Sequence, residues 1–180
     1  MKKLIIAMAI ASFAIFANAA SVDWAATYVM QPGTTSMANG YYGVLFAAED
    51  ITVADLSAKL SNGDFSSIAT YGMNAKTSNT TGSYAATGWA EKTAGSYTFY
   101  AVIFDANTTA SAKNFYVTST KTETLLDGTG NETTVAFGNL AASTMTAGNW
   151  TAINVSVPEP TSGLLLLVGM AGLALRRKRA

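Results

Sequence analysis

The stretch YTFYAVIF, residues 97–104, decides the fold of this chain. It follows Gly95-Ser96 and is rich in aromatic and β-branched residues, which favour strands. Successive side chains of a strand point to opposite faces of the sheet. The two faces are Tyr97, Phe99, Ala101 and Ile103 on one side, and Tyr100, Val102 and Phe104 on the other. Both faces are apolar, so the pattern predicts a central strand that is covered on both sides.

Shorter apolar or threonine-rich runs surround this strand, and turn-forming residues separate them. The polar turn at 105–112 and the run at 114–120 predict a hairpin with residues 97–104. The other expected strands are 22–30, 40–48, 122–126, 133–137 and 149–155. The turn residues are Pro32-Gly33, Asn39-Gly40 and Asp127-Gly128-Thr129-Gly130-Asn131.

One segment has the signals of a helix. Thr52 followed three residues later by Asp55 is a capping-box-like start, and Asn62-Gly63 supplies a stop, so residues 52–60 predict a short helix. Residues 65–71 fit either a helical turn or a short strand. The polar stretch 76–88 predicts a long loop.

These elements predict a mainly β fold, a single antiparallel β-sandwich or jelly-roll-like domain with one short helix, over residues 20–157. A signal helix before it and a hydrophobic helix after it complete the expected organisation. The domain is large enough to bury a core without disulfides.

Histidine and cysteine are both absent from the 180 residues of the chain. Their absence excludes disulfides, thiolate and imidazole metal sites, cysteine nucleophiles and Ser-His-Asp triads. We expect no metal, no cofactor and no catalytic residue. Residues 20–157 contain five lysines, ten carboxylates and no arginine, a net charge of −5. Such a domain is not expected to bind nucleic acid or anionic lipid, because both require a basic patch.

Residues 1–19 have the pattern of a secretory signal peptide. Lys2 and Lys3 precede a run of thirteen uncharged residues, 4–16. Ala17 and Ala19 then place small side chains at the positions that signal peptidase reads. We therefore expect cleavage before Ala20, with the Sec translocon and signal peptidase as partners.

The other end of the chain has three parts in a fixed order. Pro158-Glu159-Pro160 precedes an apolar segment of thirteen residues, from Gly163 to Leu175. A basic cluster follows, made of Arg176, Arg177, Lys178 and Arg179. Such a cluster stays on the cytoplasmic side. At about 1.5 Å per residue the segment spans roughly 20 Å as a helix, whereas a hydrocarbon core is about 30 Å thick. The segment is better suited to a transient stop than to a lasting anchor, although an ordinary membrane anchor is the alternative.

Val157-Pro158-Glu159-Pro160, the Leu/Gly/Ala-rich segment and the basic tip together resemble the PEP-CTERM protein-sorting signal. In that family an exosortase, a membrane-embedded cysteine transpeptidase, reads the signal. The resemblance implies cleavage near Pro-Glu-Pro after a transient stay in the inner membrane. It also implies delivery to the cell surface or to an extracellular exopolysaccharide matrix. The catalysis belongs to the processing enzyme, and this chain is its substrate.

Aromatic residues are the candidates for ligand contact in the domain. Exposed rings on a β-sheet are a general means of stacking on sugars. Trp89, beside the polar loop, is the ring expected to be most exposed. The whole candidate set is Trp24, Trp89 and Trp150, with Tyr41, Tyr42, Tyr84, Tyr97 and Tyr100. The alternative is that these rings fill the core.

Two acidic features resemble catalytic or metal-binding sites but have simpler structural explanations. Glu49-Asp50 lies just before the expected helix, where negative charge is favourable, so we interpret the pair as part of the helix start. Asp127, Thr129 and Asn131 have calcium-loop spacing. Glu132 and Gly138, however, stand where an EF-hand needs Gly and Glu. A turn is the expected structure there.

Three functions follow from the sequence. The first is a structural or adhesive protein of the surface or matrix. The second is a carbohydrate-binding module of the exopolysaccharide matrix. The third, which the residues favour least, is a small hydrolase that uses carboxylates.

Overall fold

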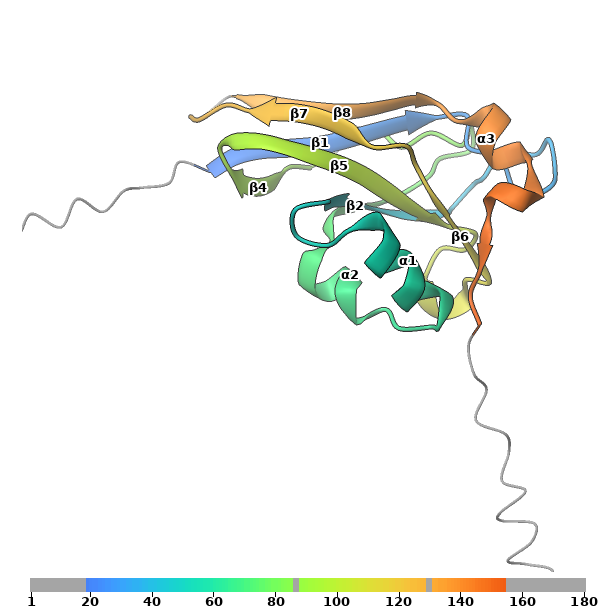
Figure 1. The fold of residues 1–180 in the computed structure, drawn as a ribbon. Helices are drawn as coiled ribbons and strands as arrows, with labels where there is room; N and C mark the ends of the chain where they lie inside the picture. The colour runs from blue at the N-terminus through green and yellow to red at the C-terminus, as the bar shows by residue number, and fades with distance from the viewer. Residues whose placement is uncertain (1–18, 86–87, 129–130, 155–180) are drawn as a thin grey trace, which may run out of the picture.

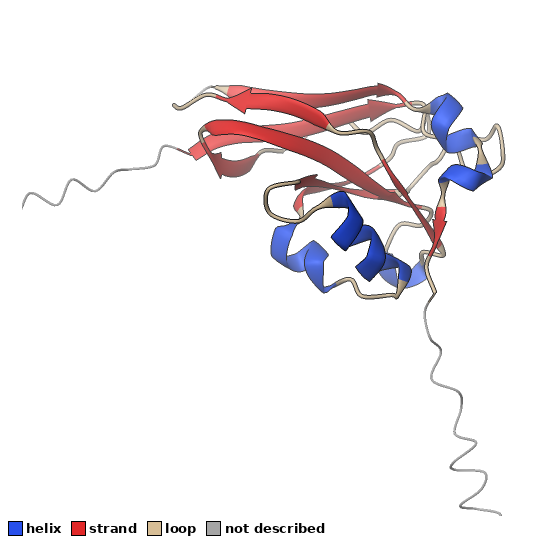
Figure 2. Ribbon diagram, viewed as in Figure 1, coloured by secondary structure: helices blue, strands red, loops and turns tan. Residues whose placement is uncertain are grey.

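The structure, a computed structural model of the chain, describes residues 19–85, 88–128 and 131–154. Two β-sheets and a few helices form this part of the molecule (Figures 1 and 2), which confirms the expected mainly β fold. The signal peptide expected at 1–19, apart from Ala19, and the sorting signal expected at 158–180 lie outside the described residues. Within the three described ranges, no helix is long and apolar enough to cross a bilayer.

The smaller sheet contains β1 (Ala19–Thr27), β4 (Ala90–Thr93) and β8 (Glu132–Asn139), in the order β4-β1-β8. β1 is antiparallel to β4 but parallel to β8. The parallel pair corrects the expectation of an entirely antiparallel fold. Parallel strands require a long connection, and here every described strand of the larger sheet except the last, Thr151–Ala152, lies between β1 and β8 in the sequence. Alternation of side chains carries no information on strand direction, so the sequence pattern could not show this.

The larger sheet has the order β3-β2-β5-β6-β9, and β7 also pairs with β5. All pairings among these described strands are antiparallel. The strands are β2 (Tyr42–Ala47), β3 (Met73–Thr77), β5 (Gly95–Phe104), β6 (Asn114–Val117), β7 (Lys121–Leu125) and β9 (Thr151–Ala152). β5 pairs with β2 along one edge, and with β7 and β6 along the other. The prediction that residues 97–104 form a central strand is therefore confirmed.

β5 separates two apolar cores. Phe99, Ala101 and Ile103 face a core that also contains side chains of β1 and β8. Tyr100, Val102 and Phe104 face a second core, which includes two leucines of the first helix. All six side chains are fully buried. Burying a large apolar side chain stabilises a fold by about 1.5–3 kcal/mol, so this strand contributes strongly to both layers.

Two helices lie on the outer side of the larger sheet (Figure 1): α1 (Val53–Ser61) and α2 (Ser66–Tyr71). The Thr52 hydroxyl accepts a hydrogen bond from the Asp55 backbone N–H at 3.1 Å, which caps α1 and confirms the helix expected at 52–60. Gly63, two residues after the end of α1, has a positive φ of 75° that suits glycine and turns the chain away from the helix. The segment 65–71, whose sequence fits either a helical turn or a short strand, is helical from Ser66.

A third helix, α3 (Ala141–Met145), and the 3-10 turns η1 (Thr109–Ser111) and η2 (Ala147–Asn149) were not expected. The prediction of one short helix is therefore wrong. The Trp150 indole N–H donates to the Thr144 carbonyl at 2.6 Å, so α3 provides the acceptor that a buried tryptophan needs. The strand expected at 149–155 is reduced to Thr151–Ala152 in the described residues.

The expected loop at 76–88 is also corrected, because Lys76 and Thr77 belong to β3. Polar side chains in this strand conceal its identity in the sequence. Lys76 is buried, and it forms an ion pair with Asp23 of β1 at 2.5 Å. The strand is therefore held by a polar contact between the two sheets, which an apolar alternation cannot reveal.

Candidate functional site

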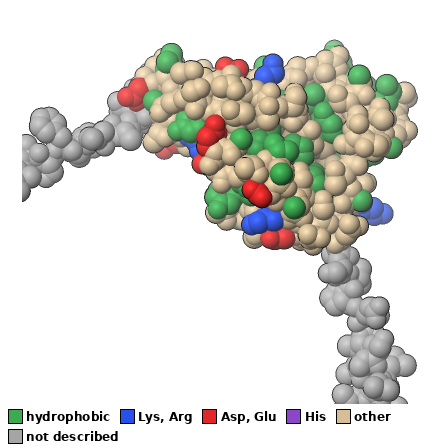
Figure 3. All heavy atoms as spheres, in the orientation of Figure 1, with side chains coloured by type: hydrophobic (Ala, Val, Ile, Leu, Met, Phe, Trp, Pro, Cys, Tyr) green, Lys and Arg blue, Asp and Glu red, His purple; other side chains and the backbone are tan. Residues whose placement is uncertain are grey.

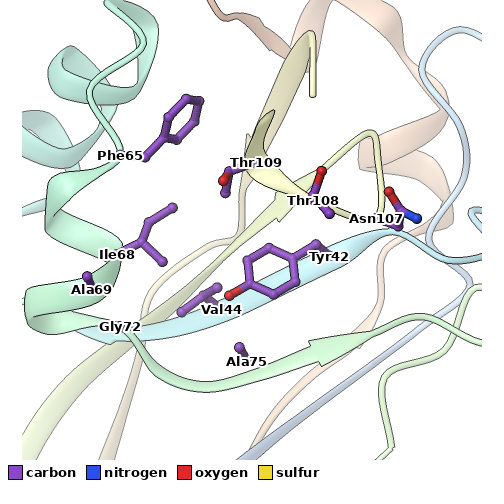
Figure 4. A pocket seen from close by; sticks show the side chains of 10 residues that line it. All are labelled: Tyr42, Val44, Phe65, Ile68, Ala69, Gly72, Ala75, Asn107, Thr108 and Thr109. Atoms are coloured by element: carbon purple, nitrogen blue, oxygen red, sulfur yellow. The ribbon is translucent and has the colours of Figure 1, made fainter. Parts of the chain in front are cut away.

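A pocket of about 520 Å³ opens between α2, β2, β3 and the loop that follows β5 (Figure 4). Its volume lies in the range of small-molecule sites. Ten residues line it: Tyr42, Val44, Phe65, Ile68, Ala69, Gly72, Ala75, Asn107, Thr108 and Thr109. The two helices therefore do not seal the outer face of the larger sheet, and a cavity remains beside α2.

The end of α2 sets the wall of this pocket. The Gly72 N–H donates to the Ile68 carbonyl at 2.9 Å as the helix ends. A Cβ at Gly72 would lie 2.4 Å from the Ile68 carbonyl oxygen and 2.8 Å from Val44 Cγ1. Only glycine fits at this position, because any side chain here would clash with the end of the helix and with β2.

Aromatic rings form the apolar side of the pocket. Tyr42 and Phe65 both contact Phe104, with ring centroids 6.1 and 6.2 Å apart. Figure 4 shows the Tyr42, Phe65 and Ile68 side chains around the same space. Tyr42 is half-buried, and this burial raises the pKa of its hydroxyl above the ordinary value. The hydroxyl stays protonated at neutral pH and is able to donate a hydrogen bond.

Polar groups from the loop after β5 form the other side. Asp105 shapes this loop, because its Oδ1 accepts from the backbone N–H of Lys113 at 2.8 Å and of Asn114 at 3.0 Å. The exposed Asn107 and Thr108 follow directly, and both line the pocket. They place an amide and a hydroxyl opposite the rings of Phe65, just before α2, and Tyr42 of β2.

The pocket is uncharged. Among its ten lining residues, all within the described ranges, Tyr42 alone carries a titratable group. The lining offers aromatic faces, hydroxyls and one carboxamide, and it has no carboxylate, ammonium or guanidinium group. This composition suits the binding of a neutral, hydroxyl-bearing molecule.

The tryptophans expected to stack on a ligand do not share a face. Trp24 is fully buried and Trp150 is 7% exposed, so both belong to the core, and the expected ligand contact is wrong for these two. Trp89 is 39% exposed, which agrees with the expectation that it is the most exposed ring of the three. Tyr84 and Tyr100 are also buried. The alternative that most rings fill the core holds for these four residues.

Glu49 and Asp50 line a shallower hollow of about 310 Å³ with Asp55. Each of these carboxylates has a structural partner. Glu49 accepts from the Thr98 backbone N–H at 2.9 Å, Asp50 pairs with Lys92, and Asp55 accepts from the Thr52 hydroxyl at 2.7 Å. Asp55 thus serves the start of α1, whereas Glu49 and Asp50 connect the preceding turn to β5 and β4.

The turn at 127–131 is described only in part, since residues 129 and 130 lie outside the described ranges. Asn131 donates from its amide to the Asp127 carbonyl at 2.6 Å, as in a local turn. In the described part of the chain, no three His, Cys, Asp or Glu side chains group closely enough to hold a metal ion.

Sequence reasoning did not find the pocket. The sequence marks Tyr42 as a candidate ring, but Phe65 and Ile68 fall in residues 65–71, whose pattern fits either a helical turn or a strand. The available signal was Tyr42 itself, a ring on a strand whose next outward residue is Val44. A second missed feature is the buried pair of Asp23 and Lys76. Its signal was a lone carboxylate inside the apolar run 20–26.

The surface around these features carries few charges. On the face shown in Figure 3, lysines and carboxylates are scattered, and most of the surface is uncharged. This agrees with the low share of charged residues in the chain, 12%. A strongly charged ligand finds no matching patch on this face.

Comparison with family models gives one match, to the PEP-CTERM protein-sorting motif, over residues 156–179. No curated protein and no solved structure matches the chain. The motif indicates export and processing by an exosortase-type enzyme. It also indicates sorting to the cell surface after a transient stay in the membrane. The match confirms the resemblance seen in the sequence: residues 156–179 carry a PEP-CTERM protein-sorting motif.

Proposed function

We propose that this surface protein is a non-catalytic, adhesive component of the extracellular matrix, and that it binds a neutral glycan in the pocket beside α2. The uncharged lining of that pocket, with aromatic rings facing hydroxyl and amide groups, carries the proposal. In this proposal the two sheets act as a β-sandwich scaffold, and the helical layer carries the binding site.

The chemistry of a sugar fits this lining. The C–H faces of a sugar ring pack on aromatic rings, as Tyr42 and Phe65 offer, while its hydroxyls need amide and hydroxyl partners, as Asn107 and Thr108 offer. The absence of a cation in the lining, and the net charge of −5 over residues 20–157, disfavour uronic-acid polymers. The expected ligand is therefore a neutral exopolysaccharide.

Calorimetry with neutral and with uronic-acid polysaccharides tests the binding proposal. We expect the protein to bind a neutral polymer, and the double substitution Asn107→Ala and Thr108→Ala to weaken binding at least tenfold. Thr134→Ala is a matched control, because Thr134 is an exposed threonine on β8 of the other sheet. Equal binding by the double variant and the control would exclude the pocket as the site.

Trp89 offers a separate test of where a glycan would bind. Its exposed ring precedes β4, on the smaller sheet rather than at the pocket. We expect Trp89→Ala to leave glycan affinity unchanged. A loss of binding in this variant, with the pocket variant unaffected, would move the site to the edge of the smaller sheet.

We also propose how the chain is processed. Signal peptidase cleaves before Ala20 after passage through the Sec translocon, and the exosortase-type enzyme acts at Pro158-Glu159-Pro160. The segment from Gly163 to Leu175 and the basic residues 176–179 hold the precursor in the inner membrane until that step. The match to the sorting motif supports this sequence of events.

Intact masses of the protein from each cell fraction test this processing. We expect a product that begins at Ala20, ends near Pro158 and is found outside the inner membrane. Replacing Pro158 and Pro160 with alanine is expected to leave an intact precursor in the membrane. Pro32→Ala is the matched control, since Pro32 is the one proline of the given sequence that lies outside the Pro-Glu-Pro motif. Normal release of the double variant would show that Pro-Glu-Pro is not what the enzyme reads.

A further inference from the structure

A lysine and an aspartate are buried side by side between β3 and β1. Lys76 Nζ lies 2.5 Å from Asp23 Oδ1, and the two side chains are 5% and 0% exposed. Complete burial of an ion pair is unusual, because each charge loses its hydration. The second ion pair of the described residues, Lys92 with Asp50, shows the ordinary case, with side chains 14% and 34% exposed.

The surroundings of the amine are specific. Lys76 Nζ donates to the Trp24 carbonyl at 2.5 Å and to the Ala85 carbonyl at 2.7 Å. A neutral amine has two N–H groups and one lone pair. If both N–H groups bond to these carbonyls, the lone pair is directed at the carboxyl group of Asp23. An amine with a free lone pair beside a carboxyl group is what a nucleophilic attack needs.

The two oxygens of the carboxyl group have different surroundings. Asp23 Oδ1 accepts from the Trp24 backbone N–H at 2.7 Å and from the Asn74 amide at 2.6 Å. Oδ2 is buried and has no hydrogen-bond partner among the described residues. Two donors on one oxygen stabilise negative charge that develops there, as in an oxyanion hole. The other oxygen is left without a bond that would hold it.

Asn74 is held in position for this contact. Its φ of +50° is uncommon for a residue other than glycine. Its amide also donates to the Gly88 carbonyl at 2.6 Å, and its own carbonyl accepts from the Trp24 indole N–H at 2.7 Å. Strained backbone persists where the surroundings fix it, often at a reactive site.

We propose that Lys76 and Asp23 join in an intramolecular isopeptide bond between Nζ and Cγ. A proton first passes from the Lys76 ammonium to Oδ2 of Asp23, which gives a neutral amine and a neutral acid and removes both charges from the interior. The lone pair of Nζ then forms a bond to Cγ, while the π electrons move to Oδ1. Contact between the buried groups replaces a bimolecular encounter.

The intermediate collapses with the loss of water. A second proton passes from Nζ to Oδ2, the Cγ–Oδ2 bond breaks, and the carbonyl reforms at Oδ1. Oδ2 leaves with two hydrogens as one water molecule, and one hydrogen stays on Nζ. The step needs no oxidant, reductant or other reactant. A buried site that excludes water then favours the amide over its hydrolysis.

The bond links the two sheets covalently. Asp23 lies on β1 of the smaller sheet, and Lys76 lies on β3 at the edge of the larger one. A cross-link between positions distant in sequence restricts the unfolded chain, as a disulfide does. The chain contains no cysteine, and this bond gives a cross-link that reducing conditions do not break.

Mass spectrometry of the purified full-length protein under denaturing conditions tests the proposal, with both chain ends defined by terminal sequencing. We expect a mass lower than that of the sequence by one water. Tryptic digestion is expected to leave Lys76 uncut and joined to the peptide that contains Asp23. A mass equal to that of the sequence would overturn the proposal, and a loss of one ammonia would place the bond on an asparagine instead.

Two variants complete the test. Lys76→Met is expected to have the full sequence mass, whether or not it folds. Lys92→Met removes the lysine of the exposed ion pair and is expected to keep the loss of one water. A loss of water that persists in Lys76→Met would show that the mass change arises elsewhere and would overturn the assignment.

Discussion

The Trp24 and Tyr84 rings stack with their centroids 4.7 Å apart and their planes inclined by 27°. Gly43 of β2 lies against both rings. A Cβ at this position would be 2.8 Å from Trp24 Cη2 and 2.9 Å from Tyr84 Cε1. The stacked pair therefore occupies the space that a side chain on β2 would otherwise fill.

We expect Gly43→Ala to destabilise the protein by about 1–3 kcal/mol, because an added methyl group in a packed core displaces the two rings. Chemical denaturation with tryptophan fluorescence as the signal measures the change. Gly148→Ala is the matched control, since a Cβ at Gly148 meets open space. Equal free energies of unfolding for the two variants would show that the two rings shift to accommodate the methyl group without a measurable cost.

Alkaline pH is expected to destabilise the fold through two buried tyrosines. Burial raises the pKa of Tyr84 and of Tyr100 well above the ordinary value. Their hydroxyls donate to the carbonyls of Tyr41 at 2.9 Å and of Ile51 at 2.8 Å. Because the folded-state pKa is the higher one, this stabilisation is complete below pH ~10 and is lost as pH rises further.

Urea denaturation at a series of pH values checks this dependence. The free energy of unfolding should be level from neutral pH to about pH 10 and should fall above it. Tyr100→Phe is expected to reduce the fall and to cost about 1 kcal/mol at neutral pH through the lost hydrogen bond. A flat profile for the unmodified protein above that pH would contradict the expected effect of burial.

The central strand could be read from the sequence because its signal is local. Phe99 and Tyr100 point to opposite faces and are both fully buried, as alternation predicts. Local signals also located α1, through the cap at Thr52. The parallel pairing of β1 with β8, by contrast, depends on contacts between distant segments, and no feature of either strand encodes its direction.

The candidate site residues show the same contrast between local sequence signals and contacts of distant segments. Trp89 was correctly expected to be exposed, because it borders a polar stretch. Trp24 and Trp150 look similar in the sequence but are buried, since β3 and α3 supply acceptors for their indole N–H groups. The pocket beside α2 depends on how the helix and the loop after β5 lie against β2, which is a tertiary relation without a local signature.

Removing the cap of α1 is expected to weaken the helical layer. Thr52→Ala deletes the acceptor for the Asp55 backbone N–H and should cost about 1 kcal/mol in the free energy of unfolding. Thr52→Ser keeps the hydroxyl and is expected to retain most of the stability. Thermal denaturation followed by circular dichroism compares the two, and similar losses in both would point to the threonine methyl group instead of the cap.

Asp105 is expected to affect both stability and glycan binding. Asp105→Ala removes the carboxylate that accepts from two backbone N–H groups, and it should cost about 1.5–3 kcal/mol. The adjoining residues 107–109 then lose their fixed position at the pocket, so we expect weaker binding of a neutral polysaccharide. Calorimetry at a temperature where the variant is folded separates the effects, and unchanged affinity would show that the loop is positioned by other contacts.

The position of β1 in its sheet has a consequence for the timing of folding. β1 is the first strand of the described residues, yet its two neighbours, β4 and β8, come from residues 90–93 and 132–139. Contacts between segments so far apart form slowly, because a long loop must close first. A chain that crosses a membrane with its amino end leading cannot complete this sheet until residue 139 has emerged. The topology thus leaves the smaller sheet incomplete during transit, until β8 has followed the rest of that sheet across.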